Sequence, residues 1–196
     1  MGRERLVLYT MSVFNVEHNV LFIHVPKTAG TSMERREFLG SGGHQTIRDY
    51  DVGNGVFKFG FVRNPWDRFV SGFVCQEAFI GASKEVFNRY IREECTNGAL
   101  PQRSVYPIHF MHQYHFLLDS HGDIGVDFVG RFESLQRDWK YVCDRVGVGN
   151  RLAHERKKIH EPYRYYYTAE SWDIIGRLYQ RDIDIFGYES AFEAWQ

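Results

Sequence analysis

A nearly continuous apolar run, Val20-Leu-Phe-Ile-His-Val25, is the feature that most limits how this chain can fold. Its β-branched residues and lack of polar alternation are typical of a strand buried on both faces of a parallel sheet. The run ends at a proline, and small residues then lead into Met33–Leu39, which we expect to be helical. Val56–Val62 repeats the strand pattern, and Asn64 with Pro65 predicts a capped helix directly after it.

Strands and helices alternate along the rest of the chain. Further strands are expected at Gln113–Leu118 and Val126–Phe132, and helices at 65–79, Lys84–Glu94, Leu135–Val146 and Glu170–Phe186. This alternation predicts an α/β layered fold with a central, mostly parallel sheet flanked by helices. Since no repeat, low-complexity tract or linker divides residues 1–196, a single domain is expected.

Composition narrows the classes of function. The chain has 24 Lys and Arg against 25 Asp and Glu, so its net charge of −1 indicates neither a nucleic-acid partner nor a membrane surface. No apolar run approaches the ~20 residues that span a bilayer, and the N-terminal apolar stretch is too short for a signal peptide. Cys75, Cys95 and Cys143 match neither a disulfide framework nor a metal knuckle. We therefore expect a cytoplasmic protein; its oligomeric state is left open.

The segment Val25-Pro-Lys-Thr-Ala-Gly-Thr-Ser32 connects the first strand to its helix. A connection of this kind directs backbone N–H groups and the positive end of the helix dipole at one point, which predicts an anion-binding loop. Gly30 permits a close backbone approach, Thr31 and Ser32 add hydroxyl donors, and Lys27 adds a mobile cation.

The order of lysine and glycine distinguishes this loop from an ATP-binding P-loop. That motif reads G-x-x-x-x-G-K-[ST], whereas here Lys27 precedes Gly30 by three residues and the first glycine is missing. A lysine at the start of the loop can reach the bridging oxygen of a 5′-phosphosulfate. Because Thr28 could still mimic the magnesium-binding residue of a P-loop, a kinase remains an alternative.

A second motif, Phe59–Phe73, places Arg63 at a strand end and Ser71 eight residues later in the next helix. Arginine binds phosphate with a two-pronged fork of N–H donors, and a helical hydroxyl can complete the pocket. Ligands of open α/β sheets bind beyond the carboxyl ends of the strands, where both motifs are expected. Two anion sites at neighbouring strand ends suit a ligand with two separated phosphate groups.

These two motifs carry a resemblance to a known family. His24–Ser32 resembles the 5′-phosphosulfate loop of the carbohydrate sulfotransferases, and Phe61–Ser71 resembles their 3′-phosphate motif. The similarity continues through Val126–Leu135 and Tyr163–Tyr167 to Phe186-Gly-Tyr188, and so covers most of the chain.

The resemblance implies a P-loop-like three-layer fold and transfer of a sulfuryl group from 3′-phosphoadenosine 5′-phosphosulfate to an acceptor hydroxyl, without a catalytic metal. It implies that Lys27 acts on the transferred group and that Arg63 and Ser71 bind the 3′-phosphate. The residues implied in donor binding are Lys27, Thr28, Ala29, Gly30, Thr31, Ser32, Arg63 and Ser71. Many animal relatives carry a membrane anchor that this chain lacks, so it looks like the short bacterial type, and the expected acceptor is a carbohydrate.

Sulfuryl transfer needs a group that accepts the proton of the acceptor hydroxyl, and histidine is the natural base near neutral pH. His44 follows the loop and its helix by one glycine turn, which could return it to the mouth of the loop, and similar O-sulfotransferases have a catalytic histidine in a comparable position. We expect His24, inside the first strand, to be packed rather than catalytic. His109, His112 and His115 are spaced by three, but no acidic or cysteine ligands accompany them, so no metal site is predicted.

Several assignments stay open at this stage. Glu133 fits a site residue or a structural ion pair equally well, and Arg156–Lys158 fits a nucleotide contact or a solvated face. The alternative functions are a P-loop-type small-molecule kinase using ATP and Mg²⁺, and a nucleotide-binding protein without activity. Tyrosines of the second half could stack on sugar rings or fill the core. They are Tyr106, Tyr114, Tyr163, Tyr165, Tyr166 and Tyr167.

Overall fold

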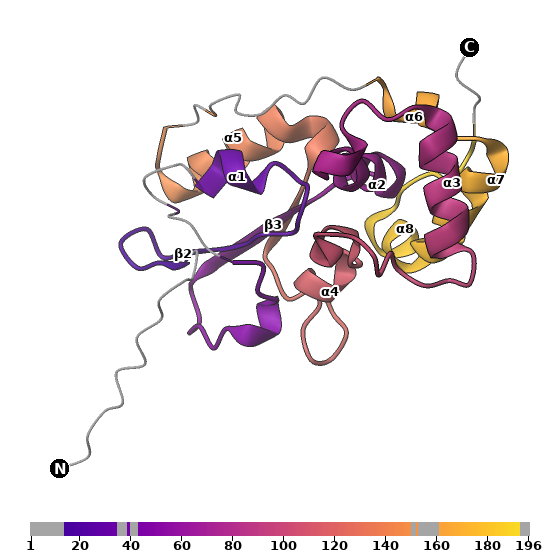
Figure 1. Cartoon of the computed structure of the whole chain (residues 1–196). Helices are drawn as coiled ribbons and strands as arrows, with labels where there is room; N and C mark the ends of the chain where they lie inside the picture. The colour runs from indigo at the N-terminus through magenta and orange to yellow at the C-terminus, as the bar shows by residue number, and fades with distance from the viewer. Residues whose placement is uncertain (1–13, 35–38, 40–42, 150–151, 153–160, 193–196) are drawn as a thin grey trace.

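The protein is built on a four-stranded sheet (Figure 1). The computed structural model describes residues 14–34, 39, 43–149, 152 and 161–192. The strands lie side by side in the order β1 (Phe14–Asn15), β2 (Val20–Ile23), β3 (Phe57–Val62) and β4 (Phe128–Arg131). β2, β3 and β4 are parallel, and β1 pairs antiparallel with β2. The predicted α/β class with a mostly parallel, helix-flanked sheet is confirmed.

The helices fall into two groups around this sheet. α1 and α5 cover one face and α4 lies on the other, while α2, α3, α6, α7 and α8 gather at one end of the molecule (Figure 1). The α-helices are α1 (Gly30–Glu34), α2 (Pro65–Val74), α3 (Lys84–Cys95), α4 (Tyr114–Leu117), α5 (Leu135–Val146), α6 (Tyr163–Tyr166), α7 (Ala169–Leu178) and α8 (Gln180–Phe186). Short 3₁₀ turns are η1 (Ile47–Asp49), η2 (Glu77–Phe79), η3 (Pro107–Phe110) and η4 (Phe132–Ser134).

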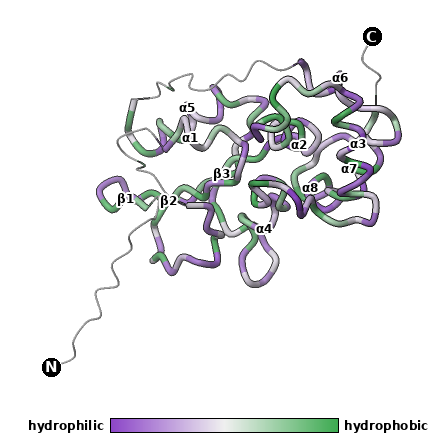
Figure 2. Tube along the Cα trace, viewed as in Figure 1, coloured by the Kyte–Doolittle hydropathy of each residue, from purple (hydrophilic) through white to green (hydrophobic). Residues whose placement is uncertain are grey.

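Alternate residues of the central strands bury their side chains on opposite faces of the sheet. Phe22 and Phe59 stack with ring centroids 5.0 Å apart on the face that also packs Trp139 of α5. Ile23 points to the opposite face, where Phe116 of α4 joins the core. Because both faces are covered, β2 and the later part of β3 are apolar throughout, as the hydropathy along the chain shows (Figure 2).

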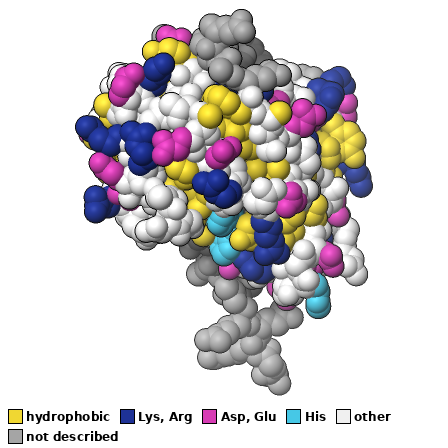
Figure 3. Space-filling model, turned by 90° about the vertical axis from the view of Figure 1, so that its right-hand side faces the viewer, with side chains coloured by type: hydrophobic (Ala, Val, Ile, Leu, Met, Phe, Trp, Pro, Cys, Tyr) yellow, Lys and Arg dark blue, Asp and Glu magenta, His cyan; other side chains and the backbone are white. Residues whose placement is uncertain are grey.

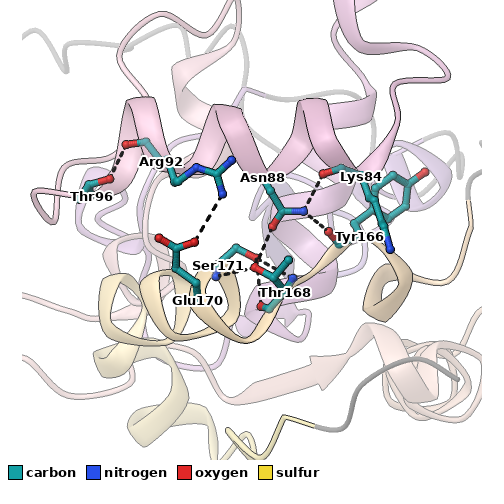
Figure 4. Close-up of polar contacts among 8 residues, drawn as sticks. All are labelled: Lys84, Asn88, Arg92, Thr96, Tyr166, Thr168, Glu170 and Ser171. Carbon is teal, nitrogen blue, oxygen red and sulfur yellow. Dashed lines mark hydrogen bonds and ion pairs between the residues drawn. The ribbon is translucent and has the colours of Figure 1, made fainter.

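The helical end has an aromatic core of its own. Trp66 of α2 and Trp172 of α7 stack with centroids 4.3 Å apart, and the indole N–H of Trp66 donates to the carbonyl of Trp172 at 2.9 Å. A buried polar residue, Asn88 of α3, donates to the carbonyl of Tyr166 at 2.7 Å and accepts from Thr168 at 3.3 Å (Figure 4). These contacts tie α2, α3 and the C-terminal helices into one packed unit.

The surface carries charges of both signs. Figure 3 shows Lys and Arg side chains interspersed with Asp and Glu over one face of the molecule, in keeping with the net charge of −1. Within the described part of the chain, every helix is too short or too polar to cross a membrane.

Three stretches differ from the sequence-based expectation. The helix predicted at 65–79 ends at Val74, and residues 77–79 form the separate turn η2. The helix predicted at Met33–Leu39 lies mostly outside the described residues, within which α1 ends at Glu34. The strand predicted at Gln113–Leu118 is wrong, because residues 114–117 form α4. The N–H groups of Gln113 and Tyr114 both donate to the carboxylate of Asp182, at 2.9 and 2.8 Å, which satisfies the donors at the start of this helical turn. The helix predicted at 170–186 is interrupted at Tyr179, which separates α7 from α8.

Candidate active site

The loop between β2 and α1 is a strained turn held by its own hydrogen bonds. Lys27 and Ala29 both have φ near 71°, in the left-handed region that costs L-amino acids about 1–2 kcal/mol each. The hydroxyl of Thr28 is fully buried and donates to the carbonyl of Val25 at 2.8 Å. Ser32 closes the turn by donating its N–H to the carbonyl of Ala29 at 2.9 Å. The backbone is thus fixed in a conformation that an ordinary strand-to-helix connection does not need.

Gly30 is glycine because the imidazole of His24 occupies the place of a side chain. A Cβ added at Gly30 would lie 2.0 Å from two ring atoms of His24. The His24 side chain is nearly buried, and its Nδ1 lies 2.7 Å from a carboxylate oxygen of Glu34 on α1. This confirms the expectation that His24 is packed, and it also places an imidazole directly against the loop.

His44 lies beside the loop, as the glycine turn before it predicted. Its Nδ1 is 3.0 Å from the carbonyl oxygen of His24, and the two imidazole rings are 4.4 Å apart at 60°. A carbonyl only accepts, so Nδ1 carries the hydrogen and the lone pair of the neutral ring is on Nε2. Burial, followed by the charge of His24, lowers the pKa of His44 below its usual 6.5. The neutral form needed in a base therefore persists at neutral pH.

Arg63 joins the second motif to the first. Its Nε and Nη2 both donate to the carboxylate of Asp67 at 2.8 Å, and Nη1 donates to the carbonyl of Lys27 at 3.3 Å. The guanidinium also lies 3.9 Å above the ring of Phe132. The two motifs therefore meet at the carboxyl end of the sheet, and Arg63 is held rigidly between them.

Two further residues, Gln113 and Glu133, hold this junction in place. Gln113 was not predicted: its side chain accepts from the N–H of Arg63 and donates to the carbonyl of Arg63, both at 2.9 Å. Glu133, left open above, accepts hydrogen bonds from the N–H of Asn64 and the hydroxyl of Tyr188. These hydrogen bonds join residues that are far apart in the sequence, so no local sequence pattern predicts them.

Ser71 lies on α2 four residues after Asp67, so both occupy the same face of the helix. Cys75 continues this face by another four residues, and its sulfur is 3.2 Å from Nδ1 of His109 on η3. Burial, and next the charge of Lys27, lower the pKa of His109 to about 3, and His44 acts in the same direction. A second neutral imidazole thus interacts electrostatically with Lys27 and His44. The sequence does not predict this role, because it depends on the packing of η3 against α2.

The structure does not bring the remaining candidate residues into one cluster. His112 stacks on Tyr114, and His115 lies 3.3 Å from Arg48. Among the described residues, no cluster of three His, Cys, Asp or Glu side chains could hold a metal ion. Thr31 is exposed and Ser32 half-buried at the start of α1. The basic stretch 156–158 lies outside the described residues.

Comparison with protein families agrees with this architecture. The model of the sulfotransferase family matches residues 11–189, which include the loop, the Arg63 junction and the C-terminal helices. Searches of curated proteins and of solved structures gave no significant match. Because the match spans nearly all of the sheet and helices described above, the chain belongs to the sulfotransferase family.

Proposed function

We propose that the protein transfers a sulfuryl group from 3′-phosphoadenosine 5′-phosphosulfate to an acceptor hydroxyl. One observation carries the proposal: Nη1 of Arg63 lies 3.3 Å from the carbonyl of Lys27, so the two anion-binding motifs are in contact. A donor with phosphate groups at both its 5′ and 3′ positions matches two adjacent motifs of this kind. In a sulfotransferase the 5′ group carries the sulfate that is transferred.

The donor contacts divide between the two motifs. In the first, the ammonium of Lys27 and the backbone of Thr28–Ser32, including Ala29, Gly30 and Thr31, surround the 5′-phosphosulfate. The hydroxyl of Thr28 is used within the loop, so this residue offers the donor its N–H. In the second, Arg63 and the hydroxyl of Ser71 bind the 3′-phosphate, and no metal takes part. The shared helix face of Asp67 and Ser71 supports this assignment, because Asp67 is the residue that orients Arg63.

The transfer is proposed to be in line. The acceptor oxygen attacks the sulfur, a new oxygen–sulfur bond forms, and the bond from sulfur to the bridging oxygen of the donor breaks. The proton of the acceptor hydroxyl passes to Nε2 of His44, and the negative charge that appears on the leaving phosphate is stabilised by Lys27. The lowered pKa of His44 and the hydrogen on its Nδ1 support its role as the base.

The proposed acceptor is a carbohydrate. Tyr106 is 48% exposed, and its ring lies 5.1 Å from that of His109, whose pKa the charges of Lys27 and His44 lower. An exposed aromatic ring next to the reacting groups suits stacking on a sugar face. By contrast, Tyr166 and Tyr167 are buried in the core and are not available for this purpose.

A single domain over residues 1–196, relationship to the short bacterial enzymes and a cytoplasmic location complete the proposal. Cys75, Cys95 and Cys143 are all described, and none of them forms a disulfide, which is compatible with a reducing compartment. The kinase alternative is disfavoured because the buried hydroxyl of Thr28 donates to the carbonyl of Val25, where a P-loop residue would bind magnesium. An assay of sulfuryl transfer distinguishes the enzyme from a binding protein without activity.

Thermal unfolding with ligands tests the donor. At 100 times its dissociation constant a ligand adds about 2.7 kcal/mol, which raises the midpoint of a chain of this length by about 5–10 °C. We expect that rise with 3′-phosphoadenosine 5′-phosphate and none with ATP and Mg²⁺; the opposite pattern would establish the kinase alternative. Transfer of labelled sulfate to glycans, phenols and lipid alcohols tests the acceptor, and transfer confined to phenols would rule out a carbohydrate.

A further inference from the structure

A nearly buried carboxylate–imidazole pair, Glu34 with His24, lies next to the proposed base His44. Nδ1 of His24 and Oε1 of Glu34 are 2.7 Å apart, and their side chains are only 8% and 12% exposed. His24 follows the last residue of β2, whereas Glu34 is on α1. The pair therefore joins the residue before the β2–α1 loop to the helix after it, and so holds the two ends of this loop together.

The same pair is in contact with His44. The carbonyl of His24 accepts the Nδ1–H of His44 at 3.0 Å, and the two rings are 4.4 Å apart. The absence of a side chain at Gly30 lets the ring of His24 occupy this position. Glu34, His24 and His44 thus form one continuous row from α1 to the mouth of the loop.

We propose that Glu34 and His24 are positioning residues for His44: His24 fixes its tautomer and orientation, and the carboxylate of Glu34 offsets the positive charge that His44 acquires during transfer. This inference rests on the proposed role of His44 as the base. When Nε2 of His44 takes the proton of the acceptor hydroxyl, the ring keeps its Nδ1–H on the carbonyl of His24. The resulting imidazolium then lies in the field of Glu34.

Among the described charges that act on His44, the carboxylate of Glu34 is the one that favours its protonation. From the end of β2, His24 opposes protonation of His44, while Glu34 on α1 and the hydrogen bond to the carbonyl of His24 favour it. On η3, His109 stays neutral at neutral pH, because burial and then the charge of Lys27 lower its pKa to about 3, and a positive charge on His44 acts in the same direction. Within the described part of the chain, the carbonyl of His24 favours the imidazolium more strongly than Glu34 does, and it stays in place when the charge of Glu34 is removed.

The test is a pH titration of ¹³C-labelled histidine by NMR, with the His44 signal assigned from its loss in His44→Gln. In Glu34→Gln the titration midpoint of His44 should fall by about 0.5 pH unit, since the charge of the Glu34 carboxylate raises the pKa of His44 and that attraction is lost. Glu170→Gln is the matched control, because Glu170 is also ion-paired, to Arg92 at 3.4 Å on the helical end (Figure 4). In Glu170→Gln the titration midpoint of His44 should equal that in the wild type.

Two further measurements keep the test decisive. Glu34→Asp retains the charge and should titrate close to the wild type; a fall equal to that of Glu34→Gln would mean that packing, not charge, is responsible, and would overturn the inference. In the wild type, long-range ¹⁵N–¹H spectra should show the hydrogen of neutral His44 on Nδ1, and finding it on Nε2 would also overturn it. Neither measurement needs donor or acceptor. If turnover depends on His44 but the midpoint of His44 does not move in Glu34→Gln, the inference alone is refuted. If the donor does not bind, the proposed function alone is refuted.

Discussion

The two strand-to-helix connections at the carboxyl end of the sheet are built in opposite ways. After β3, Asn64 accepts from the N–H groups of Trp66 and Asp67 at 3.1 and 3.3 Å, and Pro65 starts a ten-residue helix. After β2, Lys27 and Ala29 adopt left-handed backbone angles, and the helix begins at Gly30. One connection satisfies its own polar groups, and the other is bent into a conformation that costs free energy.

This difference indicates a division of roles. Strained backbone persists where the surrounding structure enforces it, and it is concentrated at functional sites. The β2 connection is also the one that His24 and His44 contact, so we expect changes there to affect the rate of transfer. In the β3 connection Arg63 is paired with Asp67 before any ligand binds, so we expect changes there to affect donor selectivity and stability.

The largest effect is expected at His44. His44→Ala should lower kcat by about 10²–10⁴-fold with little change in donor affinity, because it removes the proposed base and leaves the proposed anion-binding groups intact. Steady-state kinetics with calorimetric measurement of binding of 3′-phosphoadenosine 5′-phosphate would separate the two quantities.

The pH dependence supplies the control for this variant. His44 must be neutral to accept a proton, so the wild-type rate should fall as pH drops through its pKa, which lies below 6.5. His44→Ala should lack that acidic limb. If His44→Ala keeps both the wild-type rate and the fall in rate at acidic pH, the base is another residue, and Glu133 and His24 would be tested next.

Lys27→Ala is expected to have the next largest effect. The ammonium is proposed to stabilise charge that develops as the donor bond breaks, and loss of such a group lowers kcat by about 10²–10³-fold. Alanine keeps the Cβ at this left-handed position, so the loop conformation should survive. Lys140→Ala, at an exposed ion pair on α5, is the control and should leave kcat unchanged. Near-normal turnover of a folded Lys27→Ala protein would remove this lysine from the mechanism.

The sequence predicted those parts of the protein that depend on local pattern. The apolar run of β2, the cap at Asn64 and the helix Leu135–Val146 follow from periodicity and capping, and the structure has them where they were expected. α4 was mistaken for a strand because its start is stabilised by Asp182, nearly 70 residues away. The sequence suggested His109 only as a metal ligand, since its interaction with Lys27 and His44 depends on tertiary packing that no local pattern encodes.

Arg63→Ala tests the β3 connection through selectivity. The wild type should bind 3′-phosphoadenosine 5′-phosphate more tightly than adenosine 5′-phosphate, and the variant should lose about 10- to 100-fold of that preference, the value of a charged hydrogen-bonded contact. The ratio of the two dissociation constants cancels any general loss of stability. Asp67→Asn keeps the guanidinium and should keep most of the preference. An unchanged ratio in Arg63→Ala would show that the 3′-phosphate is bound elsewhere.

Asn64→Ala should act on stability alone. It leaves the N–H groups of Trp66 and Asp67 without their capping oxygen, which typically costs about 1 kcal/mol of unfolding free energy. Urea unfolding measures this loss, and kcat of the folded enzyme should stay within about twofold of the wild type. A large fall in kcat would contradict the division of roles between the two connections.

The smallest effect is expected at Ala29, where strain can be relieved without removing a functional side chain. Glycine at this position stabilises the folded state by removing the ~1–2 kcal/mol cost of the left-handed conformation. Two effects oppose this gain: glycine lowers the free energy of the unfolded chain by about 0.4–1 kcal/mol, and the partly buried methyl group of Ala29 is lost. Ala29→Gly should therefore stabilise the protein by no more than about 0.5 kcal/mol. Gly98 has the same φ of 71° with open space around it, so Gly98→Ala should introduce the strain without any compensating contact and cost about 1 kcal/mol. Urea unfolding of the two variants would compare them directly. If Ala29→Gly instead destabilised the protein by as much as Gly98→Ala, the β2 connection would not be strained, and the contrast between the two connections would rest on hydrogen bonding alone.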